Sequence, residues 1–350
     1  MGKYGKFAVA LLVGTFCLMC VNQSLEEFPV PVRANDVTHV VIIGDSISTR
    51  AGLAEDAYSY PEILENTTEI KIQNFAQESY TTSEILACLE DMTIQESLAD
   101  ADLIIVTAGI HDIMDPFVAK ANEFMGEFGF ARFMDVFSAN LSDYGIEDES
   151  ELLYYANQLS SCAKQNRKEA AANIEEITKN LLQYENAEII FQTVYNNINT
   201  IENYQQLSLK RRQAYNSINN PVTSVMESTF NEHLRSLAEQ YENVKTVDVF
   251  SLFQGKAYQY VNLEQLDVNP NAEGHALIAD AIIEAAGLEK KELPQPTTET
   301  TTTTETTDPS MTQTTTTTET TDPIVTQTTT TTETTDPIVT QTTTTTETTD

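Results

Sequence analysis

Short apolar runs rich in β-branched residues recur along the middle of the chain, and longer stretches with helical spacing separate them. The runs are His39–Ile43, Ile70–Phe75, Leu103–Thr107, Glu188–Val194 and Val244–Val249. Strands that are buried on both faces of a parallel sheet have this length and composition. The pattern therefore predicts a parallel sheet at the centre of one domain.

Helical patterns lie between and after the predicted strands. Apolar residues recur three or four positions apart over Asn173–Tyr184 and Ser224–Tyr241. Residues Ala272–Ala286 follow Pro270 and stop at Gly287, which are typical start and stop signals of a helix. The alternation predicts an α/β fold with a doubly wound sheet and helices on both faces. Ligands bind such sheets at the carboxyl ends of the strands.

The start of the chain differs in composition from the middle. Lys3 and Lys6 precede an apolar run from Phe7 to Val21, which is the pattern of a secretory signal. An uncleaved membrane anchor is the alternative. We assign residues 1–35 to a signal peptide and leader, and we expect a secreted, extracellular protein, with association to the cell surface as a variant of that location.

Residues 294–350 consist almost wholly of Thr, Glu, Asp, Pro and Gln. A unit of 14 residues repeats there, and its glutamates recur at Glu305, Glu319, Glu333 and Glu347. Each unit has too little apolar area to offset the entropy lost on ordering it. We expect a disordered Thr-rich linker that attaches the main domain, residues 36–293, to a cell wall or to a further domain.

The charge and the cysteines restrict the class of protein. The chain has a formal charge of −34, and the nine acidic residues of 294–350 supply only part of it. Such a surface repels nucleic acid and anionic lipid, so neither is an expected partner. Outside the predicted signal only Cys88 and Cys162 remain, and both a disulfide and two free thiols are compatible with the sequence. We expect no metal and no other cofactor, because no cluster of Cys and His is present.

A long segment, residues 115–168, separates the third predicted strand from the fourth. It is rich in aromatic residues, namely Phe117, Phe124, Phe128, Phe130, Phe133, Phe137, Tyr144, Tyr154 and Tyr155. At helical spacing, such residues pack in a core more often than they bind a ligand. We predict a helical insertion, and a cap over the site is the alternative interpretation.

The first predicted strand runs directly into Gly44-Asp45-Ser46-Ile47-Ser48. Together with Tyr60-Pro61-Glu62, this motif resembles the nucleophile block of the GDSL esterases, also called SGNH hydrolases. The resemblance spans about residues 38–287 and implies a flavodoxin-like parallel sheet of five strands. It also implies that Ser46 is the nucleophile and that its own N–H donates to the oxyanion. The alternative is that Ser46 only caps a helix.

Two further blocks carry the remaining oxyanion donors of that family, and both are altered. The first, Asn74-Phe75-Ala76-Gln77-Glu78-Ser79, ends in serine where the family has glycine. The resemblance assigns the second donor to the N–H of Ser79. The other block, Gly109-Ile110-His111-Asp112, has His111 where the family has an asparagine as third donor. An imidazole N–H can donate as well.

The block that holds the general base of the family lacks its histidine. The pattern Asp-x-His-Pro is Asp267-Val268-Asn269-Pro270 here, so Asp267 keeps the place of the orienting acid. An amide has no useful basicity, and Asn269 cannot accept the proton of Ser46. His275 does not replace the base by position. An exchange of roles is the remaining route, with His111 as base and Asn269 as oxyanion donor.

Two functions follow from these retained and altered blocks. The first is a secreted ester hydrolase, acting as a monomer on small acyl esters or acylated glycans such as polysaccharides. The second is a catalytically silent module of the same fold that binds a glycan or a protein partner. A structural spacer is disfavoured, because a spacer has no need of Gly44-Asp45-Ser46.

Overall fold

A computed structural model describes residues 37–199, 203–262, 266–291, 299–308, 311–319, 326–334 and 340–348. The described residues form two units with a boundary between Lys290 and Lys291. The predicted signal segment, residues 1–35, lies outside the described residues.

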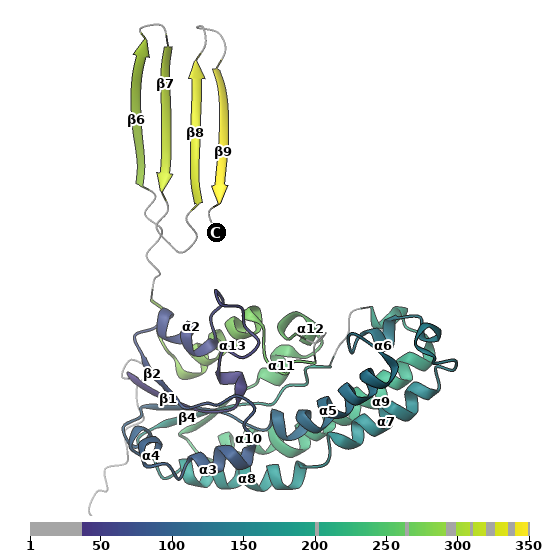
Figure 1. Ribbon diagram of the computed structural model, residues 1–350. Coiled ribbons are helices and arrows are strands. Elements are labelled where there is room, and N and C mark those ends of the chain that lie inside the picture. The colour runs from purple at the N-terminus through teal and green to yellow at the C-terminus, as the bar shows by residue number, and fades with distance from the viewer. Residues whose placement is uncertain are drawn as a thin grey trace, which may run out of the picture. The chain divides into compact units, whose positions relative to one another are not determined.

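The first unit is built on a parallel sheet of five strands (Figure 1). The strands are β1 (His39–Gly44), β2 (Lys71–Asn74), β3 (Leu103–Thr107), β4 (Glu188–Gln192) and β5 (Val244–Val247). Their order in space is β2-β1-β3-β4-β5, and all neighbours are parallel. This is the flavodoxin-like order, so the predicted fold is confirmed.

The order of the strands reverses at the centre of the sheet, between β1 and β3. These two strands pair from Val40 with Leu103 to Gly44 with Thr107. Their carboxyl ends therefore lie side by side, and this point of reversal is where sheets of this kind bind ligands. Residues that follow Gly44 and Thr107 are brought together although they are far apart in the sequence.

Helices cover both faces of the sheet. In Figure 1, α2 (Tyr60–Thr67), α11 (Val249–Phe253), α12 (Ala257–Tyr260) and α13 (Ala272–Ala286) lie on one side. On the other side lie α3 (Thr82–Cys88), α4 (Met92–Ala99), α8 (Arg167–Leu181) and α10 (Glu232–Gln240). Helix α13 has the predicted bounds and ends at Gly287 in a left-handed conformation.

The predicted insertion is helical. It contains α6 (Asp135–Ser138), η3 (Leu141–Tyr144) and α7 (Glu151–Cys162), and it begins inside a helix, because α5 spans Ile110–Phe128. Helices α5 and α7, with α9 (Leu209–Met226), project to one side of the sheet (Figure 1). Phe117, Phe133 and Phe137 are fully buried and pack edge to face, with ring centroids 5.9 and 5.5 Å apart. These aromatic side chains belong to a core.

The predicted helix Ser224–Tyr241 is interrupted in the structure. Helix α9 ends at Met226, and a π-helical turn, Glu227–Asn231, precedes α10. The side chain of Asn231 accepts from the N–H of Val194 at 2.8 Å and donates to its carbonyl at 2.9 Å. The extra residue of a π turn thus lets one side chain pair with the backbone just after β4.

The second unit includes residues 294–350, for which we predict a linker. Four strands, β6 (Glu299–Asp308), β7 (Met311–Glu319), β8 (Thr326–Thr334) and β9 (Thr340–Thr348), form an antiparallel sheet. Threonine favours strands because its branched side chain fits a pleated surface. An Asp-Pro pair recurs between the threonine runs, and such pairs favour turns. The repeat therefore has strand and turn signals in addition to its low apolar content.

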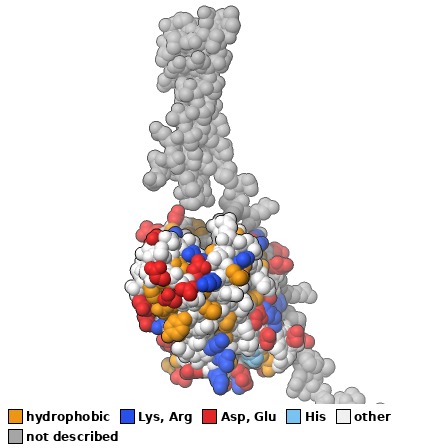
Figure 2. Space-filling model, turned by 90° about the vertical axis from the view of Figure 1, so that its right-hand side faces the viewer, with side chains coloured by type: hydrophobic (Ala, Val, Ile, Leu, Met, Phe, Trp, Pro, Cys, Tyr) orange, Lys and Arg blue, Asp and Glu red, His pale blue; other side chains and the backbone are white. Residues whose placement is uncertain are grey.

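The surface of the first unit mixes acidic, basic and apolar side chains on the face shown in Figure 2. Among the described residues, no helix combines the length and apolar character needed to cross a bilayer. Cys88 and Cys162 are free thiols. In the same part of the chain, no group of three or more His, Cys, Asp or Glu side chains is arranged to hold a metal ion.

Candidate active site

Ser46 follows β1 at a turn that requires glycine before it. Gly44 has a φ of +149°, and a Cβ there would lie 2.2 Å from Oγ1 of Thr107. Asp45 accepts a hydrogen bond from the N–H of Ile47 at 3.1 Å and caps a short 3-10 helix, η2 (Ser46–Ser48). The helix expected after Ser46 is thus a single turn. Since Asp45 provides the cap, the interpretation of Ser46 as a helix cap is not supported.

Hydroxyl groups from neighbouring elements hold this turn. Oγ of Ser48 lies 2.6 Å from the hydroxyl of Tyr60 and 2.8 Å from Oγ1 of Thr107. The N–H of Asp45 also donates to Thr107 at 3.3 Å. The side-chain amide of Asn74 donates to the carbonyl of Ser48 at 2.6 Å. The turn that carries Ser46 is therefore tied to β2, β3 and α2.

His111 lies in the first turn of α5, directly after β3. The helix begins after Gly109, whose φ is +109° and where a Cβ would lie 2.5 Å from the ring of Phe230. Because β1 and β3 are neighbours, His111 reaches Ser46, and its Nε2 lies 2.6 Å from Oγ. Ser46 is 2% exposed and His111 is 5% exposed. This hydrogen bond is shielded from water.

Asp115 contacts the other nitrogen of the same ring. Its Oδ1 lies 2.8 Å from Nδ1 of His111, one helical turn earlier. An ionised carboxylate can only accept, so Nδ1 carries the proton and Nε2 presents its lone pair to the hydroxyl of Ser46. Asp115 is not among the site residues predicted from the sequence, where it marks the start of the insertion. A spacing of four residues from His111 on a helix is the signal that could have found it.

The surroundings of His111 are strongly acidic. Burial lowers the pKa of His111, but the hydrogen bond with Asp115 and the charges of Asp45, Asp115 and Asp112 outweigh burial and hold the pKa above its ordinary value. The carboxylate of Asp112 accepts from the N–H and the hydroxyl of Thr82 at 2.9 and 2.8 Å, which ties α3 to α5. Such surroundings favour the imidazolium that forms when His111 takes a proton.

Asp267 and Asn269 are hydrogen bonded to each other. Oδ1 of Asp267 accepts from the backbone N–H of Asn269 at 2.9 Å and from its Nδ2 at 2.7 Å. The amide oxygen of Asn269 is buried and has no hydrogen-bond partner among the described residues. The structure therefore brings Ser46 and His111 together, and it pairs Asp267 with an amide that cannot transfer a proton.

Ser79 keeps the backbone conformation that the family's glycine would supply. Its φ is +62°, in the left-handed region. A residue with a Cβ adopts this region at a cost of about 1 kcal/mol. The loop therefore keeps a left-handed residue at position 79 although that residue is a serine.

His275 has a different environment. Its Nδ1 accepts from the N–H of Tyr60 at 3.1 Å, and the two rings stack with centroids 6.1 Å apart. Burial lowers the pKa of His275 to about 4. It is a neutral packing residue at the start of α13.

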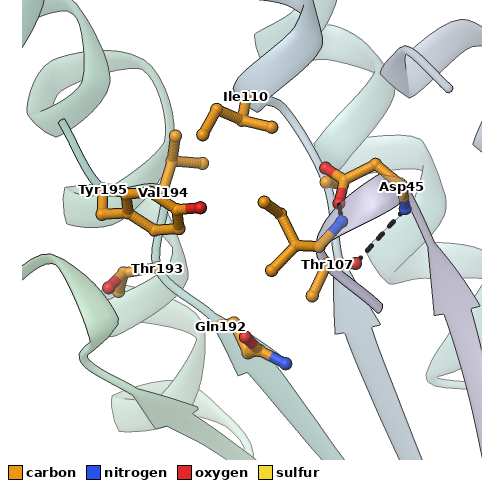
Figure 3. Close-up of a pocket in the computed structure, with 9 residues that line it drawn as sticks. Asp45, Thr107, Ile110, Gln192, Thr193, Val194 and Tyr195 are labelled. Carbon is orange, nitrogen blue, oxygen red and sulfur yellow. Dashed lines mark hydrogen bonds between the residues drawn. The ribbon is translucent and has the colours of Figure 1, made fainter. Parts of the chain in front are cut away.

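A small cavity lies behind the nucleophile turn, at the carboxyl ends of β1, β3 and β4 (Figure 3). Asp45, Thr107, Ile110, Gln192 and Tyr195 are among the residues that line it, and its volume is about 20 Å³. This is room for one water molecule. The cavity is too small for a larger ligand.

A comparison with protein families identifies the chain. A model described as the GDSL-like lipase/acylhydrolase family matches residues 42–277, which include Ser46, His111 and Asn269. The chain belongs to this family. No curated protein sequence matches it.

Several solved structures are similar to this GDSL-family chain. The lipase Lip_vut3 from a goat rumen metagenome is 16% identical, with a TM-score of 0.41, over 72% of this chain and 99% of that one. A phospholipase A1 from Streptomyces albidoflavus is 13% identical, with a TM-score of 0.45, over 71% and 99%. A lipase/acylhydrolase from Enterococcus faecalis is 14% identical, with a TM-score of 0.33, over 73% and 100%.

Proposed function

We propose that this protein hydrolyses carboxylic esters, with Ser46 as nucleophile and His111 as general base. The contact of 2.6 Å between Ser46 Oγ and His111 Nε2 carries the proposal. It supplies a base to a serine whose family base has been replaced by Asn269. Membership of the GDSL-like lipase/acylhydrolase family supports the same reaction class.

The reaction follows the general scheme of serine hydrolases. His111 Nε2 takes the proton of the hydroxyl as Ser46 Oγ bonds to the ester carbonyl carbon. The tetrahedral intermediate collapses, the bond to the alcohol oxygen breaks, and His111 returns the proton to that alcohol. Water then attacks the acyl-Ser46 ester with His111 again as base, and the carboxylic acid leaves.

The oxyanion needs donors other than His111. One imidazole nitrogen cannot accept the serine proton and donate to the oxyanion in the same step. We therefore assign the oxyanion to the backbone N–H groups of Ser46 and Ser79. Asn269 is the candidate third donor, because Nδ2 has a second hydrogen beyond the one that it donates to Asp267.

An acylated glycan, such as a polysaccharide, is the substrate class that fits the sequence best. The predicted secretion signal in residues 1–35 and the threonine repeats of 294–350 support an extracellular monomer attached to a cell wall or a further domain. Transport of labelled protein into the medium, and its release of acetate from acetylated polysaccharides, test this part separately.

Hydrolysis of p-nitrophenyl acetate by the purified protein tests the chemistry. We expect Ser46→Ala and His111→Ala each to lower kcat by about 10³-fold or more, since nucleophile and base act as a unit. Asn269→His should not raise kcat by more than about tenfold, because the base is already present. A His111→Ala variant with the native rate contradicts the assignment of the base.

A catalytically silent module is the second candidate, and the replacement of the family histidine by Asn269 favours it. In that case the native protein has no activity and does not react with a fluorophosphonate probe. A gain of hydrolysis on Asn269→His would establish that the fold is intact and that its base was lost. The search would then turn to a glycan or protein partner.

A further inference from the structure

We propose that Asp115 is the residue that orients His111, so that the base and its acid lie on one helical turn and Asp267 is no longer part of the catalytic unit. This inference rests on the proposed ester hydrolase function. The family pattern places the acid at Asp267, next to the position of the missing histidine.

The geometry of the imidazole ring carries the proposal. Its two nitrogens point to two different groups, Nε2 to Ser46 Oγ at 2.6 Å and Nδ1 to Asp115 Oδ1 at 2.8 Å. A hydrogen bond at Nδ1 fixes the tautomer and the ring orientation that present Nε2 to the serine hydroxyl. Asp115 would therefore act through His111, without touching the substrate.

Helix α5 holds this pair in register. Residues four apart lie on the same face of a helix, and the ion pair between His111 and Asp115 has this spacing. The start of the helix is fixed on two sides, by the contact of Gly109 with Phe230 and by the hydrogen bonds of Asp112 to Thr82. The orientation of His111 thus depends on its own helix.

Other carboxylates face His111, but their side chains bond elsewhere. Asp45 on the nucleophile turn accepts from Ile47, and Asp112 accepts from Thr82. Glu84 on α3 also interacts electrostatically with His111, and it accepts from Thr81. The imidazole is hydrogen bonded to Asp115.

Asp267 cannot orient a base in this chain. Its Oδ1 accepts two hydrogen bonds from Asn269, a residue with no transferable proton. The pair at 267 and 269 keeps the family's contact without its chemistry. Removal of the Asp267 carboxylate should therefore disturb the loop around residues 267–269 but leave proton transfer by His111 intact.

The test compares the pH dependence of p-nitrophenyl acetate hydrolysis for the native protein, Asp115→Asn, Asp115→Glu and Asp267→Asn. We expect Asp115→Asn to lower kcat by about 10- to 100-fold. This is less than the loss of about 10⁴ for a buried triad acid, because the side chain of Asp115 is 48% exposed. The acid limb of its pH profile should also move to lower pH, since a negative charge beside His111 is lost.

The remaining variants separate a positioning role from a structural one. Asp115→Glu keeps the charge and should retain more activity than Asp115→Asn. Asp267→Asn should leave the acid limb unmoved, because Asp267 is hydrogen bonded to Asn269 and not to His111. Glu123→Gln, which removes another ion-paired carboxylate of α5, is the matched control and should behave as native. A native rate and pH profile in Asp115→Asn, or an acid limb that moves in Asp267→Asn, overturns the proposal.

A second measurement distinguishes failure of this inference from failure of the proposed function. A native protein that neither hydrolyses the ester nor reacts with a fluorophosphonate probe refutes the function. The titration of His111, followed by NMR and assigned with His111→Gln, then judges Asp115. We expect Asp115→Asn to move its midpoint to lower pH by more than about half a unit. An unmoved midpoint overturns the role of Asp115.

Discussion

At the scale of single residues, the surroundings of a histidine decide its chemistry. His111 and His275 are both buried, but the pKa of His111 lies above its ordinary value and that of His275 falls to about 4. Burial acts on both rings in the same direction. At His111 the neighbouring carboxylates, with Asp115 hydrogen bonded to the ring, outweigh burial, whereas at His275 burial dominates. His111 therefore binds a proton more readily than an ordinary histidine does, and His275 binds one less readily.

The low pKa of His275 predicts a loss of stability in acid. In the unfolded chain His275 binds a proton below a pH of about 6.5, whereas in the folded state it stays neutral until the pH falls to about 4. Stability from this group is present above pH 6.5 and is lost as the pH falls, by up to about 3 kcal/mol. Urea unfolding of the native protein and of His275→Asn between pH 7 and 4 isolates the effect. A difference in unfolding free energy that does not vary with pH contradicts it.

The left-handed conformation of Ser79 predicts how glycine is tolerated there. Ser79→Gly removes the strain of the Cβ and adds backbone entropy to the unfolded chain, and these effects nearly cancel. We expect the unfolding free energy to change by less than about 0.5 kcal/mol. The control, Ala172→Gly at an exposed position inside α8, should lose about 1 kcal/mol. Thermal unfolding that gives equal losses for both variants would contradict this account.

At the scale of elements, the strands were predictable and the site was only partly so. Apolar runs located all five strands, and helix start and stop signals located α13, because burial and capping are local properties. The motif of the family located Ser46 and His111. Asp115 was not predicted, because its contact with His111 depends on where α5 starts. In the sequence, residue 115 was assigned to the insertion instead of to the helix that carries His111. The contact of His111 with Ser46 depends on the pairing of β1 with β3, which is tertiary structure and cannot be read from local sequence patterns.

The π-helical turn shows a second limit of sequence patterns, and it leads to a prediction. Asn231 is fully buried and is hydrogen bonded to both the N–H and the carbonyl of Val194. Asn231→Ala leaves two buried backbone groups without a partner, so we expect a loss of about 2–4 kcal/mol in unfolding free energy. Asn180→Ala, which removes an exposed hydrogen bond on α8, should cost less than about 0.5 kcal/mol. Similar losses in urea unfolding would refute the role given to Asn231.

At the scale of the whole molecule, the chain divides into two units of different composition. The first has the core, the site and both free thiols, and the second has the threonine repeats. In the first unit, buried side chains from the sheet and the helices form one continuous cluster. The first unit therefore has a core of its own on which to fold.

This division predicts the effect of removing the repeats. A chain that ends at Lys291 should melt within about 2 °C of the full chain. Its kcat on p-nitrophenyl acetate should also match that of the full chain. Differential scanning calorimetry and the ester assay, run on both chains, check the two expectations. A lower melting temperature for the shortened chain would mean that the repeats stabilise the first unit.

The placement of His111 and Asp115 on one helical turn suggests a route by which the base could have changed position during evolution. If Ser46 and His111 act as proposed, an ancestor with histidine at both 111 and 269 would have had two alternative bases around one serine. Each would have had its own acid, Asp115 or Asp267. Such redundancy would let either histidine be lost without loss of the base, and Asn269→His would create that arrangement in this chain. The loop that carries Asp267 and Asn269 is then released from proton transfer, and Asn269 keeps only its candidate role as an oxyanion donor.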